Sequence, residues 1–207
     1  ITLRSLARHP LLALVLSLAI ASSSVLGATK YVSKGATGAN DGTSWANAWN
    51  EFNQIAWGSV TAGDTILLDG GTTRKIYTTP LVVGTSGTSG SPITIRVATE
   101  AGRNGKVEIF GGRTAILPFS DHAYVFQSAT YSPPQTALYN NGVDITGRSY
   151  ITIDGNRWGG IKVYGFAKFG VAVSRFTGTP VRDSSFITIR NIESCDNGRF
   201  LFWDYTS

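Results

Sequence analysis

Short segments in which hydrophobic residues alternate with polar ones, or run together, recur along most of the chain. The clearest are 93–97, 151–153 and 187–189. A period of two residues is typical of β-strands. The other segments are 30–33, 64–68, 81–83, 107–110, 143–145, 161–163 and 171–173. No convincing helix separates them, so the pattern excludes a series of βαβ units.

Internal repeats indicate how these strands are ordered. Segment 149–154 recurs as 185–190, at an offset of 36 residues, and segment 142–146 recurs as 170–174, at an offset of 28 residues. Segment 92–96 resembles an earlier copy of the first element. Because two strand types alternate, each repeat must contain more than one strand. We therefore expect coils of three short strands, each burying its Val and Ile side chains against the next coil.

One such coil is expected to comprise 170–173, 186–189 and 192–194, and the next coil to begin at Gly198. The two offsets differ because the turn 175–184 carries extra residues. Longer turns gather on one side of a solenoid and usually form its binding face.

The segment 44–57 is the best helix candidate in the sequence. Trp45, Trp49 and Phe52 fall at positions i, i+4 and i+7, which share one face of a helix. The first residue of the segment is a serine, which can cap a helix, and Gly58 can end one. The sequence therefore predicts an N-terminal helix that covers the open end of the strand core.

The first residues have the three parts of a secretory signal peptide. Arg4 and Arg8 supply a positive start, 11–21 is apolar, and 22–27 is rich in small residues, which favours cleavage before Ala28. The apolar part is shorter than the roughly 20 residues that span a bilayer. We expect an exported protein, secreted, periplasmic or at the cell surface, without stable membrane insertion.

Three regions follow from these patterns. They are a signal peptide at 1–27, a strand with a capping helix at 28–62, and β-helix coils at 63–207. The chain starts with Ile1 rather than Met, and 199–205 resembles an apolar strand without a closing turn. We therefore expect an N-terminal fragment of a longer protein, incomplete at the C-terminus.

Composition and charge limit the kinds of molecule that we expect the protein to bind. Charged residues make up 15% of the chain against 42% hydrophobic residues, which is the balance of a globular core. The net charge of +5 is small and dispersed, which argues against nucleic acid. Cys195 is the only cysteine, so an internal disulfide is excluded. We expect a monomer that binds polysaccharide.

Four segments carry a resemblance to a known group: 31–33, 40–45, 62–68 and 87–95. From about Thr29 to its end, the chain resembles secreted right-handed parallel β-helix proteins of the pectate lyase-like superfamily, including polysaccharide lyases similar to alginate lyase and chondroitinase B. The resemblance implies an all-β, right-handed parallel β-helix. It is specific for the fold and weaker for the activity, because one fold serves several functions.

In those lyases, the resemblance implies cleavage of uronate-containing polymers by β-elimination. A Lys or Arg acts as base or acid, and Ca²⁺ often neutralises the uronate carboxylate, which lowers the barrier to proton removal. The resemblance places the catalytic residues on middle coils, beyond residue 207, so none is assigned in this sequence.

Several polar residues are candidates for contacts with substrate. Asp144 is expected to face outward, and Arg148 and Arg175 follow equivalent strands and can pair with uronate carboxylates. Ordinary solvated surface positions are the alternative for all three. A sugar-stacking platform is another possibility, with core packing as its alternative; its residues would be Trp158, Tyr164, Phe166 and Phe169.

A calcium site is the second candidate. Its oxygen ligands would come from Asp183, Glu193, Asp196 and Asp204, although their spacing is not that of a calcium-binding loop. Scattered solvated carboxylates are the alternative.

Three functions remain open at this point. The first is a lyase on an anionic polysaccharide, the second is a non-catalytic carbohydrate-binding or adhesive surface protein, and the third is a glycoside hydrolase. A hydrolase would need two carboxylates about 5–10 Å apart on the binding face.

Overall fold

The protein is all-β, with strands gathered in parallel sheets. The computed structural model describes residues 27–112, 141–166, 169–195 and 197. A five-stranded sheet contains β1 (Thr29–Val32), β2 (Thr65–Leu68), β5 (Ile93–Val97), β8 (Ser149–Asp154) and β11 (Ser185–Arg190). A four-stranded sheet contains β3 (Arg74–Tyr77), β6 (Lys106–Phe110), β9 (Ile161–Tyr164) and β12 (Ile192–Cys195). A three-stranded sheet contains β4 (Leu81–Val82), β7 (Val143–Asp144) and β10 (Val171–Ala172).

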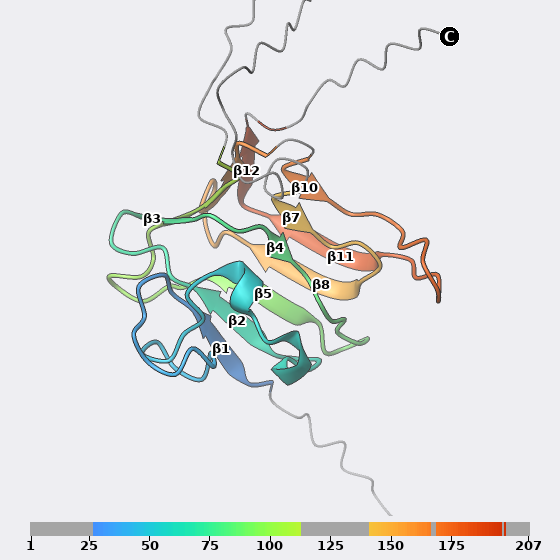
Figure 1. The fold of residues 1–207 in the computed structure, drawn as a ribbon, viewed down its shortest axis with the longest axis horizontal. Helices are drawn as coiled ribbons and strands as arrows, with labels where there is room; N and C mark the ends of the chain where they lie inside the picture. The colour runs from blue at the N-terminus through green and yellow to red at the C-terminus, as the bar shows by residue number, and fades with distance from the viewer. Residues whose placement is uncertain (1–26, 113–140, 167–168, 196, 198–207) are drawn as a thin grey trace, which may run out of the picture.

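From β2 onward the chain visits these sheets in a fixed cyclic order. It passes from the five-stranded to the four-stranded and then to the three-stranded sheet before it returns. Each strand therefore lies beside the strand one cycle earlier, as Figure 1 shows for β2, β5, β8 and β11. Every strand pair in these sheets is parallel.

The register confirms the sequence repeats. Ile187 pairs with Ile151 across the offset of 36 residues, and Val171 pairs with Val143 across the offset of 28 residues. Ile93 pairs with Ile151 in turn, so segment 92–96 is an earlier copy of the same strand. The period of two places alternate aliphatic side chains inside, because successive side chains of a strand point to opposite faces.

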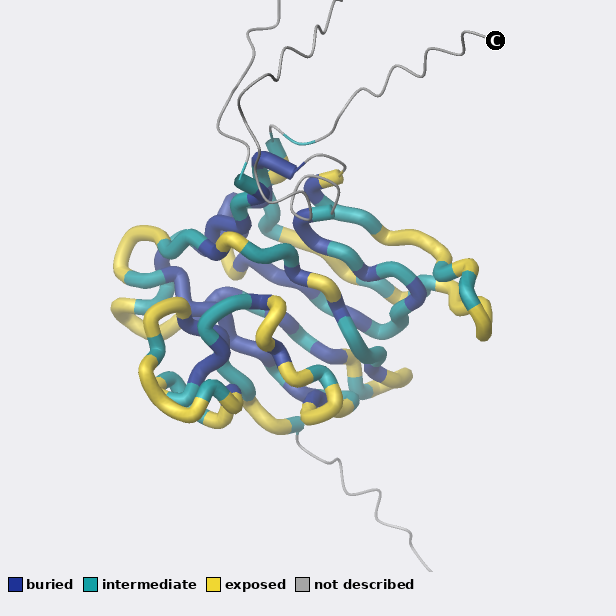
Figure 2. Tube along the Cα trace, in the orientation of Figure 1, coloured by how far each residue is buried: buried dark blue, intermediate teal, exposed yellow. Residues whose placement is uncertain are grey.

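Rows of identical or similar side chains run across the five-stranded sheet. Ile66, Ile95 and Ile153 form an inner row, and each is fully buried. The strands β2, β5 and β8 each contain buried residues, whereas β11 contains none, and Figure 2 shows the exposed positions mainly in the turns. The outer face carries a row of threonines; its members are Thr29, Thr65, Thr94, Thr152 and Thr188.

The inward prediction is wrong for part of the last described cycle. Val171 and Ile187 pack against the core, whereas Val173 is 45% exposed and Ile189 is 37% exposed. Val173 directly follows β10 and Ile189 lies on β11, and both strands are the outermost members of their sheets in the described part of the chain. Neighbours on one side only cannot bury an aliphatic pair as fully as neighbours on both sides.

The predicted helix over 44–57 is wrong. This segment contains bends and two short 3-10 helices, Phe52–Gln54 and Trp57–Ser59. The backbone of Trp49 bonds sideways to β1, since Trp49 N donates to Tyr31 O and Trp49 O accepts from Ser33 N. The backbone N–H and C=O of Trp49 are therefore not available for the hydrogen bonds of an α-helix. Trp49 and Phe52 are nevertheless buried in the core, so these two aromatic side chains cover the strands although the segment forms no α-helix.

Strand β3 had no counterpart in the sequence prediction. It begins with Arg74 and Lys75, and an inward-facing lysine hides the alternation that marks a strand. The predicted signal peptide at 1–27 lies outside the described residues except for Gly27, and 199–205 also lies outside them. Within the residues that the structure describes, there is no helix with the length and apolar character needed to cross a membrane.

Candidate functional site

The longest described turn from the three-stranded to the five-stranded sheet forms a projecting loop between β10 and β11. Phe176 and Arg182 pair as a short antiparallel bridge, with N···O distances of 2.8 and 3.1 Å. The equivalent turn one cycle earlier, between β7 and β8, is much shorter. The expected extra residues at 175–184 are thus confirmed, and Figure 1 shows the loop extending away from the sheets at the right.

Hydroxyl groups hold the base of this loop to the turn beneath it. Gly147 N donates to Ser184 Oγ at 2.8 Å, and the Ser184 hydroxyl lies 2.8 Å from Ile145 O. Thr146 Oγ1 and Ser174 Oγ are 2.7 Å apart. Gly147 has a φ of 65°, a conformation that glycine adopts without strain. The loop is therefore fixed at its base.

Two arginines lie at the base of the loop, where a Cβ on Gly147, the residue before Arg148, would be 3.3 Å from Arg182 Cβ. Arg148 donates from Nε to Val83 O at 3.0 Å, and Arg182 lies with its guanidinium 4.4 Å from the centre of the Phe176 ring. Burial, followed by the nearby charge of Arg182, lowers the pKa of Arg148 from its ordinary value. Among the described residues, neither guanidinium has a carboxylate within ion-pair distance.

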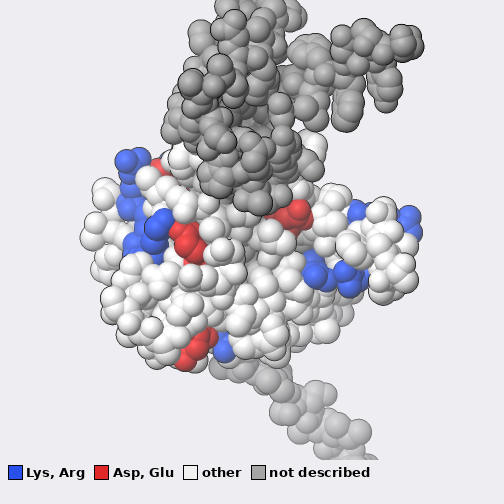
Figure 3. Space-filling view, viewed as in Figure 1, with Lys and Arg blue, Asp and Glu red and all other residues white. Residues whose placement is uncertain are grey.

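The third arginine of the group is neutralised. Arg175 Nε lies 3.1 Å from Asp183 Oδ1, and both side chains are largely exposed. Figure 3 shows Lys and Arg side chains gathered around this loop at the right of the view. Together with Arg148 of the turn beneath it, the loop, which we call the arginine loop, thus combines one neutralised and two unneutralised arginines, which favours an anionic ligand with carboxylate or sulfate groups.

Asp144, the other predicted substrate contact, has a local structural role. Its Oδ2 accepts from Asn141 Nδ2 at 2.8 Å, and its Oδ1 accepts from Thr146 N at 2.9 Å. These contacts fix the turn that leads to Arg148. The structure thus places Asp144, Arg148 and Arg175 on or beside neighbouring strands. The carboxylate of Asp144, however, serves to order the turn between β7 and β8.

The structure describes two of the predicted calcium ligands, Asp183 and Glu193, and each pairs with basic side chains. Asp183 pairs with Arg175 in the loop, whereas Glu193 lies on β12 between Lys106 Nζ at 3.3 Å and Lys162 Nζ at 3.4 Å. In the part of the chain that the structure describes, no three His, Cys, Asp or Glu side chains are placed to hold a metal ion. Asp183 and Glu193 therefore do not fit a shared calcium site, and Asp196 and Asp204 lie outside the described residues.

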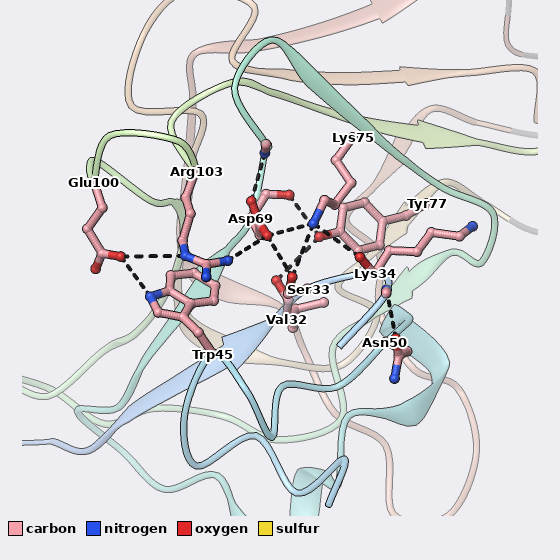
Figure 4. A network of polar contacts seen from close by, with 12 residues as sticks. Val32, Ser33, Lys34, Trp45, Asn50, Asp69, Lys75, Tyr77, Glu100 and Arg103 are labelled. Atoms are coloured by element: carbon pink, nitrogen blue, oxygen red, sulfur yellow. Dashed lines mark hydrogen bonds and ion pairs between the residues drawn. The ribbon is translucent and has the colours of Figure 1, made fainter. Parts of the chain in front are cut away.

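A buried polar network at the start of β3 was not anticipated from the sequence (Figure 4). Asp69 Oδ2 accepts from Lys75 Nζ at 2.6 Å, from Ser33 Oγ at 2.6 Å and from Arg103 Nη1 at 2.8 Å. The guanidinium of Arg103 also lies over the Trp45 ring, 4.3 Å from its centre. A signal was present in the sequence, since Asp69 follows a buried strand directly and Lys75 begins the next.

This network is fully paired. Burial alone would raise the pKa of Asp69, but hydrogen bonds, first from Lys75 and then from Ser33, outweigh it and hold the pKa below its ordinary value. Burial raises the pKa of Tyr77, whose hydroxyl donates to the Asp69 carbonyl at 2.8 Å. Satisfied buried charges of this kind order a fold and offer no free group to a ligand.

The four aromatic candidates do not form one platform. Phe166 is buried in the core, and Tyr164 stacks on Phe110 with ring centres 4.9 Å apart. Trp158 is 83% exposed in the turn after β8, and Phe169 is 65% exposed before β10. Only the last two are thus exposed enough to stack against a sugar.

No protein-family model matches this chain, and no curated protein matches it either. The functional argument therefore depends on the geometry of the fold and of the arginine loop.

Proposed function

We propose that the protein is an exported right-handed parallel β-helix that binds an anionic, uronate-containing polysaccharide through its arginine loop. The cyclic order of the three parallel sheets supports the β-helix, because successive cycles then stack as coils. The resemblance of 31–33, 40–45, 62–68 and 87–95 to secreted β-helix proteins supports the right hand and the export.

One observation carries the binding proposal. Arg148 and Arg182 lie at the base of the same loop, since a Cβ on Gly147, the neighbour of Arg148, would lie 3.3 Å from Arg182 Cβ, and no carboxylate among the described residues pairs with either guanidinium. Two nearby like charges are stabilised when an anion binds between them. A uronate carboxylate suits this site because a guanidinium donates two parallel hydrogen bonds to it.

Lyase activity is the reaction that this site favours. β-Elimination requires neutralisation of the uronate carboxylate next to the proton that leaves, and paired guanidinium groups can supply it. Non-catalytic binding is the alternative, and it needs only the same two arginines. Among the described residues near the loop, Asp144 is bonded to Asn141 and Asp183 is paired with Arg175, so these two acids do not support a hydrolase.

The test uses the full chain with alginate, polygalacturonate and chondroitin sulfate. We expect the double variant Arg148→Gln/Arg182→Gln to bind at least about tenfold more weakly, because each charged hydrogen bond contributes about 1.5–3 kcal/mol. Lys34→Gln/Arg96→Gln removes the same charge elsewhere and serves as the control. Equal binding by both double variants would contradict the proposal. A rise in unsaturated-uronate absorbance would identify a lyase, and binding without that rise would identify a non-catalytic protein.

A further inference from the structure

The turn between β8 and β9 presents an exposed tryptophan beside basic side chains of the four-stranded sheet. Trp158 is 83% exposed, and its turn is closed by Gly160 N, which donates to Arg157 O at 2.8 Å. A Cβ placed on Gly159 would lie 3.4 Å from Glu193 Oε2 and 3.8 Å from Lys106 Nζ. The residue next to Trp158 therefore lies close to the ion pair of Glu193 and Lys106.

This turn is held rigidly from both sides. Asp154 at its start accepts from Asn191 Nδ2 at 2.7 Å and from Asn156 N at 2.8 Å, and it pairs with Arg190 at 2.9 Å. Arg157 donates from Nη1 to Asn104 O at 2.7 Å. An exposed aromatic ring on a fixed turn loses little conformational freedom when a ligand binds to it.

The charge around the turn is positive. A single carboxylate, that of Glu193, lies between the ammonium groups of Lys106 and Lys162, so one positive charge remains uncompensated within this trio. The side-chain hydrogen bond of Arg157 goes to a neutral carbonyl, which adds a second positive charge beside Trp158. An anionic ligand is therefore favoured at this surface.

We propose that Trp158, Lys106 and Lys162 form a second binding surface for an anionic polysaccharide. A sugar ring stacks on the indole, and carboxylate or sulfate groups pair with the two ammonium groups. The surface belongs to the turn between the five-stranded and four-stranded sheets, whereas the arginine loop follows the three-stranded sheet. The choice of an anionic polysaccharide as the ligand rests on the proposed function, but the residues of this surface differ from those of the arginine loop.

A polysaccharide suits this surface better than a nucleic acid does. Single-stranded nucleic acids are bound by several stacked aromatic side chains along a basic groove. In the described part of this surface one indole is exposed rather than a series of aromatic rings. A single ring suits the stacking of one sugar unit better than the stacking of successive bases.

The test measures binding of the full chain to alginate, polygalacturonate, chondroitin sulfate, dextran and single-stranded DNA by affinity electrophoresis. We expect Trp158→Ala to bind the anionic polysaccharide roughly fivefold more weakly, with an effect of the same direction from Lys106→Gln/Lys162→Gln. Phe186→Ala removes another exposed ring and is the matched control. The thermal unfolding of each variant establishes that it is folded.

The outcomes separate this surface from the arginine loop. Weaker binding by the Trp158 and lysine variants with dextran unbound supports the second surface. Unchanged binding in those variants, together with a loss in Arg148→Gln/Arg182→Gln, overturns the second surface and leaves the proposed function in place. The reverse result supports the second surface and removes the arginine site. Tighter binding to DNA than to any polysaccharide, or binding to none of the polymers, overturns the inference.

Discussion

Lys75 Nζ lies 2.6 Å from Asp69 Oδ2, and this pair joins the end of β2 to the start of β3. Lys75 pairs in register with Val107, so a lysine occupies a position that an aliphatic side chain holds in the next cycle. The buried carboxylate of Asp69 compensates for the charge of this lysine. Ionic contacts therefore hold this turn between the five-stranded and four-stranded sheets, as the pair of Asp154 and Arg190 does at the turn after β8.

Replacement of this carboxylate should destabilise the protein strongly. Asp69→Asn leaves Lys75 and Arg103 without their shared partner in a partly buried site, which we expect to lower the free energy of unfolding by about 3 kcal/mol. Urea unfolding at pH 7 measures the change. The exposed Asp183→Asn is the control and should stay within about 0.5 kcal/mol of the wild type; a similar loss in both variants would contradict the structural role of Asp69.

The contribution of Asp69 should also depend on pH. Its pKa in the folded protein is lower than the ordinary value, so the folded state favours the carboxylate. The stabilisation is then fully present above the unfolded pKa of about 3.9 and is lost as the pH falls through the lower folded value. We expect the stability difference between wild type and Asp69→Asn to be constant between pH 7 and 5 and to shrink below pH 4. A difference that persists at pH 2 would show that the carboxylate charge is not its source.

Most of the strands could be predicted from the sequence. A strand that buries one face alternates hydrophobic and polar side chains, and this alternation is visible in the sequence itself. The repeats at 149–154 and 185–190 also gave the register, since identical side chains in adjacent coils pair directly. The segment 44–57 could not be predicted this way. Trp49 and Phe52 are buried at a spacing that a helix would also have, but the hydrogen bonds from the Trp49 backbone to β1 depend on tertiary structure, which the local sequence does not reveal.

The candidate site was predictable only in part. The extra residues at 175–184 and the positions of Arg148 and Arg175 followed from the repeat offsets. The pairing of Arg175 with Asp183, and the approach of Arg182 to Arg148, depend on how the loop folds back at Phe176. The ion pairs of Glu193 cross from β12 to β6 and β9, so they required the order of strands in the sheet.

The alternation on β8 predicts opposite effects at adjacent positions. Ile151 is fully buried between Ile93 and Ile187, so Ile151→Ala should lower the free energy of unfolding by about 2–5 kcal/mol. Thr152 faces outward in the threonine row, and Thr152→Ala should cost less than about 1 kcal/mol. Urea unfolding of both variants is the measurement. Equal costs at the two positions would show that β8 does not bury one face only.

At position 186 we expect replacement of Phe186 by glycine to give a more stable protein than replacement by alanine. Its ring stacks on Tyr150 with centroids 4.5 Å apart, and both residues have positive φ, at 55° and 57°. Once the ring is removed, alanine keeps the left-handed strain of about 1–2 kcal/mol whereas glycine does not. Phe186→Gly should therefore unfold at higher temperature than Phe186→Ala, the reverse of the usual order within a strand. An alanine variant that is the more stable of the two would contradict the strain.

Removal of the acid in the arginine loop should strengthen binding. Asp183 neutralises Arg175 in an exposed pair, so Asp183→Asn frees a third guanidinium at little cost to stability. If the loop binds an anionic polysaccharide, we expect affinity for polygalacturonate to rise about threefold at low salt, and the gain to shrink at 0.5 M NaCl because exposed charges are screened. Affinity electrophoresis at both salt concentrations measures this, with Asp41→Asn as a control that removes an acid from the distant N-terminal segment. A gain of the same size in the control would indicate a general charge effect, and no gain in Asp183→Asn would place the polymer away from Arg175.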